Sequence, residues 1–150
     1  MKKDIRYVPT PKAVVEGMLD LCKLGPEDFL IDLGSGDGRI PIEAGVRGAQ
    51  ARGIDIDRSL LRRSEYNARE AGVSARVQFY WGNLFSADVS EATVVTLYLR
   101  HRINMDLRPK LLSELRPGTR IVSHSFEMGD WEPEREVEVE TKLLYLWTVP

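Results

Sequence analysis

An acidic residue, three closely spaced glycines and a second acid form the part of the sequence best suited to binding chemistry. The segment DLGSGDG, residues 32–38, ends one apolar run, and Asp55 ends the next. Glycines in such a turn let the backbone adopt φ > 0 and approach a ligand closely. An acid about 20 residues beyond the turn stands where a ribose-hydroxyl acceptor is expected. The pattern predicts a site for an adenosine-bearing cofactor.

The spacing within the turn favours S-adenosylmethionine over a dinucleotide. Dinucleotide sites typically read G-x-G-x-x-G and place a pyrophosphate at a helix N-terminus, whereas this turn reads G-x-G-x-G. The carboxylate of Asp37 would repel a pyrophosphate, but not a ligand with a sulfonium and an α-amino group. A purely structural turn is the alternative, and the two flanking acids argue against it. The predicted cofactor-binding residues are Asp32, Gly34, Ser35, Gly36, Asp37, Gly38 and Asp55.

Strand-like and helix-like segments alternate along the chain, which predicts an α/β fold with a mainly parallel sheet. Seven strands are expected, at residues 29–33, 51–56, 77–81, 93–99, 119–123, 137–140 and 143–149. Helices are expected after Thr10, near Asp37, after Asp57 or Ser59, and over residues 103–115 with a kink or break at Pro109. The last two strands read as an antiparallel hairpin. Because ligands bind outside the carboxyl ends of the strands in open α/β sheets, the glycine turn lies in the predicted site.

Length and composition indicate one soluble domain. A chain of 150 residues forms a single domain, 1–150, and its formal charge of −2 lacks the basic excess typical of nucleic-acid binders. No apolar run approaches the roughly 20 residues of a membrane span. The N-terminus leads into no apolar signal core. These features predict a cytoplasmic protein without a membrane partner.

The glycine turn and its acids resemble the motifs of class I S-adenosylmethionine-dependent methyltransferases. Residues 32–38 are similar to the acid-x-Gly-x-Gly-x-Gly motif of that class, and Asp55 resembles the acid that holds the ribose diol. The segment WGNLF, residues 81–85, is similar to the loop that lines the adenine. The resemblance extends the predicted cofactor-binding set to Ile56, Asn83 and Leu84. It implies a Rossmann-like, seven-stranded, mostly parallel sheet with a C-terminal antiparallel hairpin and helices on both faces.

A narrower resemblance covers nearly the whole chain. Residues 7–11, 32–39, 90–96 and 115–124 are similar to segments of the small archaeal-type protein lysine methyltransferases. That family is a single Rossmann-like domain with almost no added substrate domain. The resemblance implies methyl transfer from S-adenosylmethionine to lysine side chains of a protein with accessible lysines. Residues 1–25 would form an N-terminal segment and helix that cover the cofactor site.

The acceptor must be desolvated and close to the donated methyl group. A lysine amine has to lose its proton, and its ordinary pKa near 10.4 makes this costly at pH 7 unless apolar walls lower it. Tyr7, Thr10 and Tyr98 are the predicted residues of the methyl-transfer site, with Pro9 and Phe126 as further walls. Amide and adenine methyltransferases carry Asn/Asp-Pro-Pro-aromatic where this chain reads TLYL, residues 96–99. That difference disfavours planar amines as acceptors.

Other candidate residues leave alternatives open. His124 follows the fifth expected strand and is either a base for the lysine proton or a structural histidine. Cys22 reads as a small core residue, and His101 as solvent-facing; with so few ligands no metal site is expected. The alternatives to lysine methylation are a small-molecule or RNA methyltransferase on the same fold and a non-catalytic cofactor-binding protein. The oligomeric state is open, and a monomer is compatible with the sequence.

Overall fold

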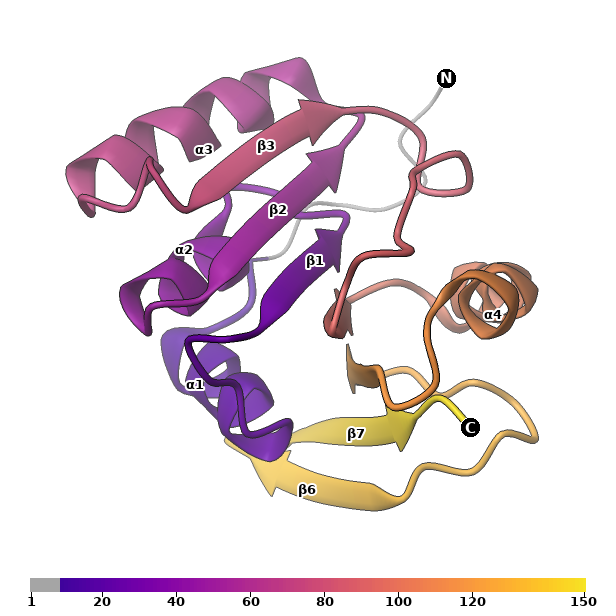
Figure 1. Ribbon diagram of the computed structural model, residues 1–150. Coiled ribbons are helices and arrows are strands. Elements are labelled where there is room, and N and C mark those ends of the chain that lie inside the picture. Colours follow the sequence, from indigo (N-terminus) through magenta and orange to yellow (C-terminus); the bar gives the residue numbers. More distant parts are fainter. Residues whose placement is uncertain (1–8) are drawn as a thin grey trace.

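The structure, a computed structural model, describes residues 9–150 and arranges them as helices around one sheet (Figure 1). Its helices are α1 (Lys12–Leu21), α2 (Arg39–Val46), α3 (Arg58–Glu70) and α4 (His101–Glu114). Its strands are β1 (Phe29–Leu33), β2 (Gln50–Asp55), β3 (Val77–Trp81), β4 (Val94–Leu97), β5 (Arg120–His124), β6 (Arg135–Val139) and β7 (Lys142–Thr148). Tyr7, one of the predicted acceptor-site residues, lies outside the described range.

The sheet confirms the predicted architecture. Its strand order is β3-β2-β1-β4-β5-β7-β6. Strands β1 to β5 are parallel, and β7 pairs antiparallel with both β5 and β6. The order reverses between β1 and β4, so the carboxyl ends of these neighbouring strands meet at the point where open α/β sheets bind ligands.

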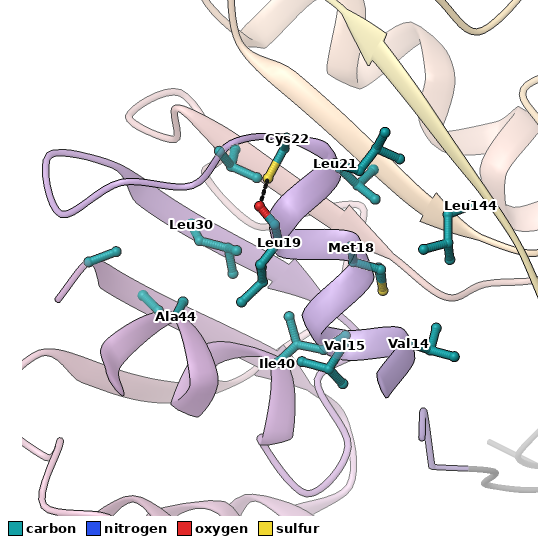
Figure 2. Packing of buried hydrophobic residues seen from close by; sticks show 14 of the residues in the cluster. Val14, Val15, Met18, Leu19, Leu21, Cys22, Leu30, Ile40, Ala44 and Leu144 are labelled. Carbon is teal, nitrogen blue, oxygen red and sulfur yellow. Dashed lines mark hydrogen bonds between the residues drawn. The ribbon is translucent and has the colours of Figure 1, made fainter. Parts of the chain in front are cut away.

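Helices cover both faces of the sheet, but unequally. α1, α2 and α3 contribute buried side chains to one face, whereas α4 contributes Leu107 and Leu111 to the other. Figure 2 shows α1 packed between its neighbours, with Val15 beside Ile40 of α2. Burial of these apolar side chains fixes α1 against the sheet. The start of α1 is thereby held close to the start of α2.

Cys22 belongs to this core rather than to a reactive site. It is buried at the end of α1, where its thiol donates a weak hydrogen bond to the carbonyl of Leu19 at 3.5 Å (Figure 2). Burial raises the pKa of the thiol from 9.0 to about 11. A thiol with such a pKa is a poor nucleophile at neutral pH. Within residues 9–150, no cluster of three or more His, Cys, Asp or Glu could hold a metal ion.

The ends and continuity of individual elements can be compared with their predictions. α4 runs without a break through Pro109, which is exposed, so that solvent can satisfy the carbonyl deprived of its helical partner. α2 begins at Arg39, near the predicted start at Asp37, and its N-cap Gly38 has a left-handed φ of 86° that favours glycine. β4 ends at Leu97, which leaves Tyr98 beyond the strand at the edge of the sheet.

Candidate cofactor and acceptor site

The glycine turn after β1 is tied to the neighbouring strand by its own backbone. The amides of Gly34 and Ser35 both donate to the carbonyl of Ile54, at 2.8 and 3.1 Å. The amide of Gly36 donates to the carboxylate of Asp55 at 2.9 Å. These bonds bring the two predicted parts of the cofactor site, the turn and the acid after β2, into direct contact.

The same bonds explain why this turn is not suited to a pyrophosphate. All three turn glycines have positive φ, and the amide of Gly38 donates to the carbonyl of Ser35 at 2.9 Å. A phosphate cradle needs backbone N–H groups that point at the ligand, but those of Gly34, Ser35, Gly36 and Gly38 are engaged within the protein. Asp37 is paired with the guanidinium of Arg39, Nε to Oδ1 at 3.0 Å, so its charge is partly neutralised. Exclusion of a dinucleotide therefore depends on the engaged amides more than on repulsion by Asp37.

Two residues of helix α3, which were not predicted from the sequence, hold the turn through hydrogen bonds. The buried hydroxyl of Ser64 donates to the carbonyl of Gly36 at 2.9 Å, and the amide of Asn67 donates to the carbonyl of Asp37 at 3.1 Å. Polar residues three apart on the otherwise apolar face of a helix are the signal that could have indicated this role. The site thus depends on β1, β2 and α3 together.

Gly53 of β2 is a third residue that was not predicted from the sequence, and it makes room for the turn. The side chain of Ser35 is buried beneath the turn, with its Oγ unpartnered. A Cβ added at Gly53 would lie 2.6 Å from that Oγ and 2.7 Å from the ring of Phe79. Atoms do not approach so closely, so a larger residue must displace the turn or the ring.

Asp32 is buried near the end of β1. It is 3% exposed, and its Oδ1 accepts a hydrogen bond from the hydroxyl of Thr96 on β4 at 2.8 Å. Burial raises the pKa of Asp32 from 3.8 to about 7. The hydrogen bond from Thr96 lowers this pKa, whereas the nearby carboxylates of Asp55 and Asp37 raise it further. A positively charged ligand group beside this buried carboxyl would stabilise its ionised form and lower its pKa.

Asp55 is half-buried, and its carboxylate is oriented by two backbone amides. Oδ2 accepts from Gly36, and Oδ1 accepts from the amide of Asp57 at 2.9 Å. These two bonds fix the orientation of the Asp55 carboxylate at the carboxyl end of β2.

The predicted adenine residues follow β2 and β3. Ile56 is exposed, and its carbonyl accepts a hydrogen bond from the indole of Trp81 at 3.0 Å, which joins the ends of the two strands. Asn83 is exposed and accepts from the amide of Phe85 at 2.8 Å, whereas Leu84 packs on the core. These side chains lie on the Asp55 side of the turn.

On the other side of the turn, aromatic side chains form a stack at the carboxyl ends of β4 and β5. The rings of Tyr98 and His124 are 3.8 Å apart at 22°, and the ring of Phe126 lies 6.3 Å from that of Tyr98. Tyr98 and Phe126 are half-buried, while His124 is 1% exposed. The stack provides the apolar wall expected of an acceptor site.

Thr10 connects this wall to the glycine turn. Its Oγ1 lies 3.4 Å from Nδ1 of His124, and its carbonyl accepts a hydrogen bond from Arg39 at 3.0 Å. Arg39 in turn holds Asp37 of the turn. The structure therefore brings Thr10 and Tyr98 together with the predicted cofactor residues.

The donor set fits a cationic, adenosine-bearing group. Asp32 and Asp55 lie at the carboxyl ends of β1 and β2, four turn amides are engaged within the protein, and an aromatic stack lies nearby. Combined with the sheet topology, this defines a class I S-adenosylmethionine-dependent methyltransferase.

Comparison with known proteins shows the family. Residues 32–135 match the ANTKMT methyltransferase domain, and the chain belongs to that family. It is 44% identical to a protein-lysine N-methyltransferase of Saccharolobus islandicus, over 91% of this chain and 86% of the relative. This confirms the resemblance seen in the sequence and the assignment of S-adenosylmethionine as cofactor.

Two further relatives differ in their named substrates. An adenine nucleotide translocase lysine N-methyltransferase of Mus musculus is 30% identical over 99% of this chain, which spans 65% of that protein's length. A Salinibacter ruber protein described as an RNA methyltransferase, solved with S-adenosyl-L-homocysteine, superposes with a TM-score of 0.94 at 53% identity, covering 95% and 94% of the two chains. The family is thus clear, whereas the acceptor has to be argued from the site.

We expect cofactor affinity to rise with pH through the titration of Asp32. Below pH 7 its carboxyl is mainly protonated, and binding of a cation must release that proton, so affinity should rise about eight-fold between pH 6 and 7.5. Over this interval the ligand's α-amino group, with an ordinary pKa near 8, stays mostly charged. Calorimetry in buffers of different ionisation enthalpy measures both the affinity and the proton release.

Asp32→Asn supplies the control for this prediction. The variant should bind the cofactor more weakly at pH 7.5 and show a flatter pH dependence, because the titrating group is gone. An unchanged pH slope in the variant would assign the titration to another group.

Proposed function

We propose that this protein transfers methyl groups from S-adenosylmethionine to lysine side chains of a protein substrate. The observation that carries the proposal is the aromatic stack of Tyr98, His124 and Phe126 beside the glycine turn. Its support from comparison is the 44% identity to the Saccharolobus protein-lysine N-methyltransferase.

The stack suits an amine that must be neutral to react. The half-buried rings of Tyr98 and Phe126 provide an environment of low polarity, which lowers the pKa of a lysine ammonium placed against them. Thr10, just before α1, contacts His124 of the aromatic stack. The roles of Thr10 and Tyr98 as acceptor-site residues, and that of Tyr7, remain part of this proposal.

The chain's residues act by positioning rather than by covalent chemistry. The bound cofactor supplies a methyl group on a sulfonium, which the amine nitrogen takes by forming a C–N bond as the C–S bond breaks and its electron pair stays on sulfur. We assign Asp32, Gly34, Ser35, Gly36, Asp37 and Gly38 to the methionine end, Asp55 to the ribose, and Ile56, Asn83 and Leu84 to the adenine. Tyr98 and Phe126 exclude water from the acceptor.

RNA is the rival acceptor, favoured by the name of the Salinibacter relative. Against it stands the formal charge of −2, because RNA-binding surfaces are usually basic. The residues after β4 also offer Tyr98-Leu99 in place of the Pro-Pro motif that holds planar amines. These features favour lysine over a nucleobase.

Incubation with methyl-labelled S-adenosylmethionine decides between the two. The purified protein is given a lysate fraction containing both proteins and RNA, and the product is then divided and treated with protease or with ribonuclease. We expect protease to release the label and ribonuclease to leave it, with amino-acid analysis giving methyl-lysine. Asp55→Ala, assayed in parallel, controls for contaminating activity.

Label in RNA alone would contradict the proposal and support the rival. Label in small molecules alone would indicate a metabolite acceptor. Cofactor binding without transfer to any acceptor would indicate a non-catalytic binding protein.

The proposed partner is a protein with accessible lysines in the cytoplasm. Within residues 9–150, every helix is too short or too polar to span a bilayer. The one cysteine, Cys22, forms no disulfide within the chain, which is compatible with a reducing compartment.

A further inference from the structure

His124 has a hydrogen-bonding capacity that the described residues leave unused. Its side chain is 1% exposed, and its Nε2 is buried without a hydrogen-bond partner. Buried polar atoms are rarely left unpaired, because desolvation without a new hydrogen bond costs about 1–3 kcal/mol. An unpaired atom in the wall of a candidate acceptor site therefore points to a ligand.

The ring is held in place from two sides. It stacks on Tyr98 at 3.8 Å, and its Nδ1 faces the hydroxyl of Thr10 at 3.4 Å. Behind it, Ser125 adopts a positive φ of 73°, and its amide donates to the carbonyl of Leu143 at 2.8 Å. Strain of this kind is retained where the surrounding structure fixes a functional conformation.

The protonation of Nδ1 determines what Nε2 can do. A neutral imidazole has one N–H donor and one acceptor nitrogen. When Nδ1–H donates to Thr10 Oγ1, the lone pair remains on Nε2. Burial lowers the pKa of His124 from 6.5 to about 4, and the positive charge of Lys142 acts in the same direction, so the ring is neutral at physiological pH.

We propose that Nε2 of His124 accepts a hydrogen bond from the substrate amine, in the tautomer whose Nδ1–H donates to Thr10 Oγ1. The inference rests on the proposed lysine acceptor. One N–H of the neutral amine bonds to Nε2, which turns the nitrogen lone pair toward the methyl donor. The ammonium proton leaves for solvent before transfer, and His124 takes up no proton in the reaction.

This assignment differs from general-base catalysis. A base with a pKa near 4 is too weak to take the proton of a lysine ammonium, whose ordinary pKa is near 10.4. His124 therefore orients an amine that the apolar wall has already made neutral. Its contribution should appear in kcat and leave cofactor binding unchanged.

His124→Phe tests the hydrogen bond because it keeps an aromatic ring against Tyr98 but removes both nitrogens. We expect kcat for a lysine substrate to fall about 10- to 100-fold, the usual effect of losing orientation, with little change in the dissociation constant of S-adenosylmethionine. Thr10→Val should lower kcat less, because the ring keeps its stack on Tyr98 and loses only the contact at Nδ1. His101→Phe, at an exposed histidine of α4, is the matched control and should retain activity.

Measurements of melting temperature and cofactor affinity identify variants that are misfolded. His124→Gln supplies a second test, because its amide oxygen restores a hydrogen-bond acceptor. Partial recovery of kcat in His124→Gln relative to His124→Phe is expected. Wild-type kcat in a folded His124→Phe would overturn the role of Nε2 while leaving lysine methylation intact. If the wild-type protein methylates only RNA, the proposed function itself fails, which is a separate result.

Discussion

Replacing Gly53 with alanine is expected to destabilise the protein and weaken cofactor binding together. The new Cβ would lie 2.6 Å from Oγ of Ser35 and 2.7 Å from the ring of Phe79. Overpacking of this kind typically costs about 1–3 kcal/mol. Because Ser35 is part of the glycine turn, relief of the clash must move the turn whose amides meet Ile54 and Asp55. Thermal unfolding and calorimetric titration with S-adenosylmethionine measure the two effects.

Two further variants separate the clash from a general effect of alanine. At Gly82 an added Cβ meets nothing within 4 Å, so Gly82→Ala should unfold at the wild-type temperature. Adding Ser35→Gly to Gly53→Ala should recover part of both losses, since it removes the nearest contact. Wild-type stability and affinity in Gly53→Ala would show that the turn does not depend on this space.

Replacing Asp55 with alanine is expected to weaken S-adenosylmethionine binding by about 1–3 kcal/mol, or roughly 5- to 150-fold in dissociation constant. The substitution removes the predicted ribose acceptor and also leaves the amides of Gly36 and Asp57 without their partner. Both effects act on the cofactor site, and calorimetry reports their sum.

Asp57→Ala is the matched control, because it removes a carboxylate two residues away. Asp57 caps α3 through the amides of Ser59 and Leu60, so its loss should lower stability by about 1 kcal/mol while cofactor affinity stays near the wild-type value. Equal loss of affinity in the two variants would mean that net charge, not the position of Asp55, governs binding.

The sequence was sufficient to predict the fold because its local signals agree with one another. Strand and helix alternation, the capping residue Asp57 and the stop at Gly72 all correspond to observed elements. Pro109 did not break α4, because at its exposed position solvent can replace the hydrogen bond that proline cannot donate.

The candidate site was only partly predictable, because motifs identify residues that touch a ligand better than residues that support them. The glycine turn and Asp55 were evident from spacing, yet Ser64, Asn67 and Gly53 support the turn from elements whose relative position only the fold shows. The stack of His124 on Tyr98 likewise joins the ends of two strands. From sequence alone, His124 was undecided between a base and a structural residue.

A crystal structure of the complex with S-adenosyl-L-homocysteine tests the central claim most directly. We expect ribose hydroxyls within hydrogen-bond distance of Asp55, the amino acid end of the ligand at the glycine turn near Asp32, and the sulfur facing Tyr98. A ligand whose ribose makes no contact with Asp55, or whose sulfur faces away from the aromatic stack, would contradict the assigned site.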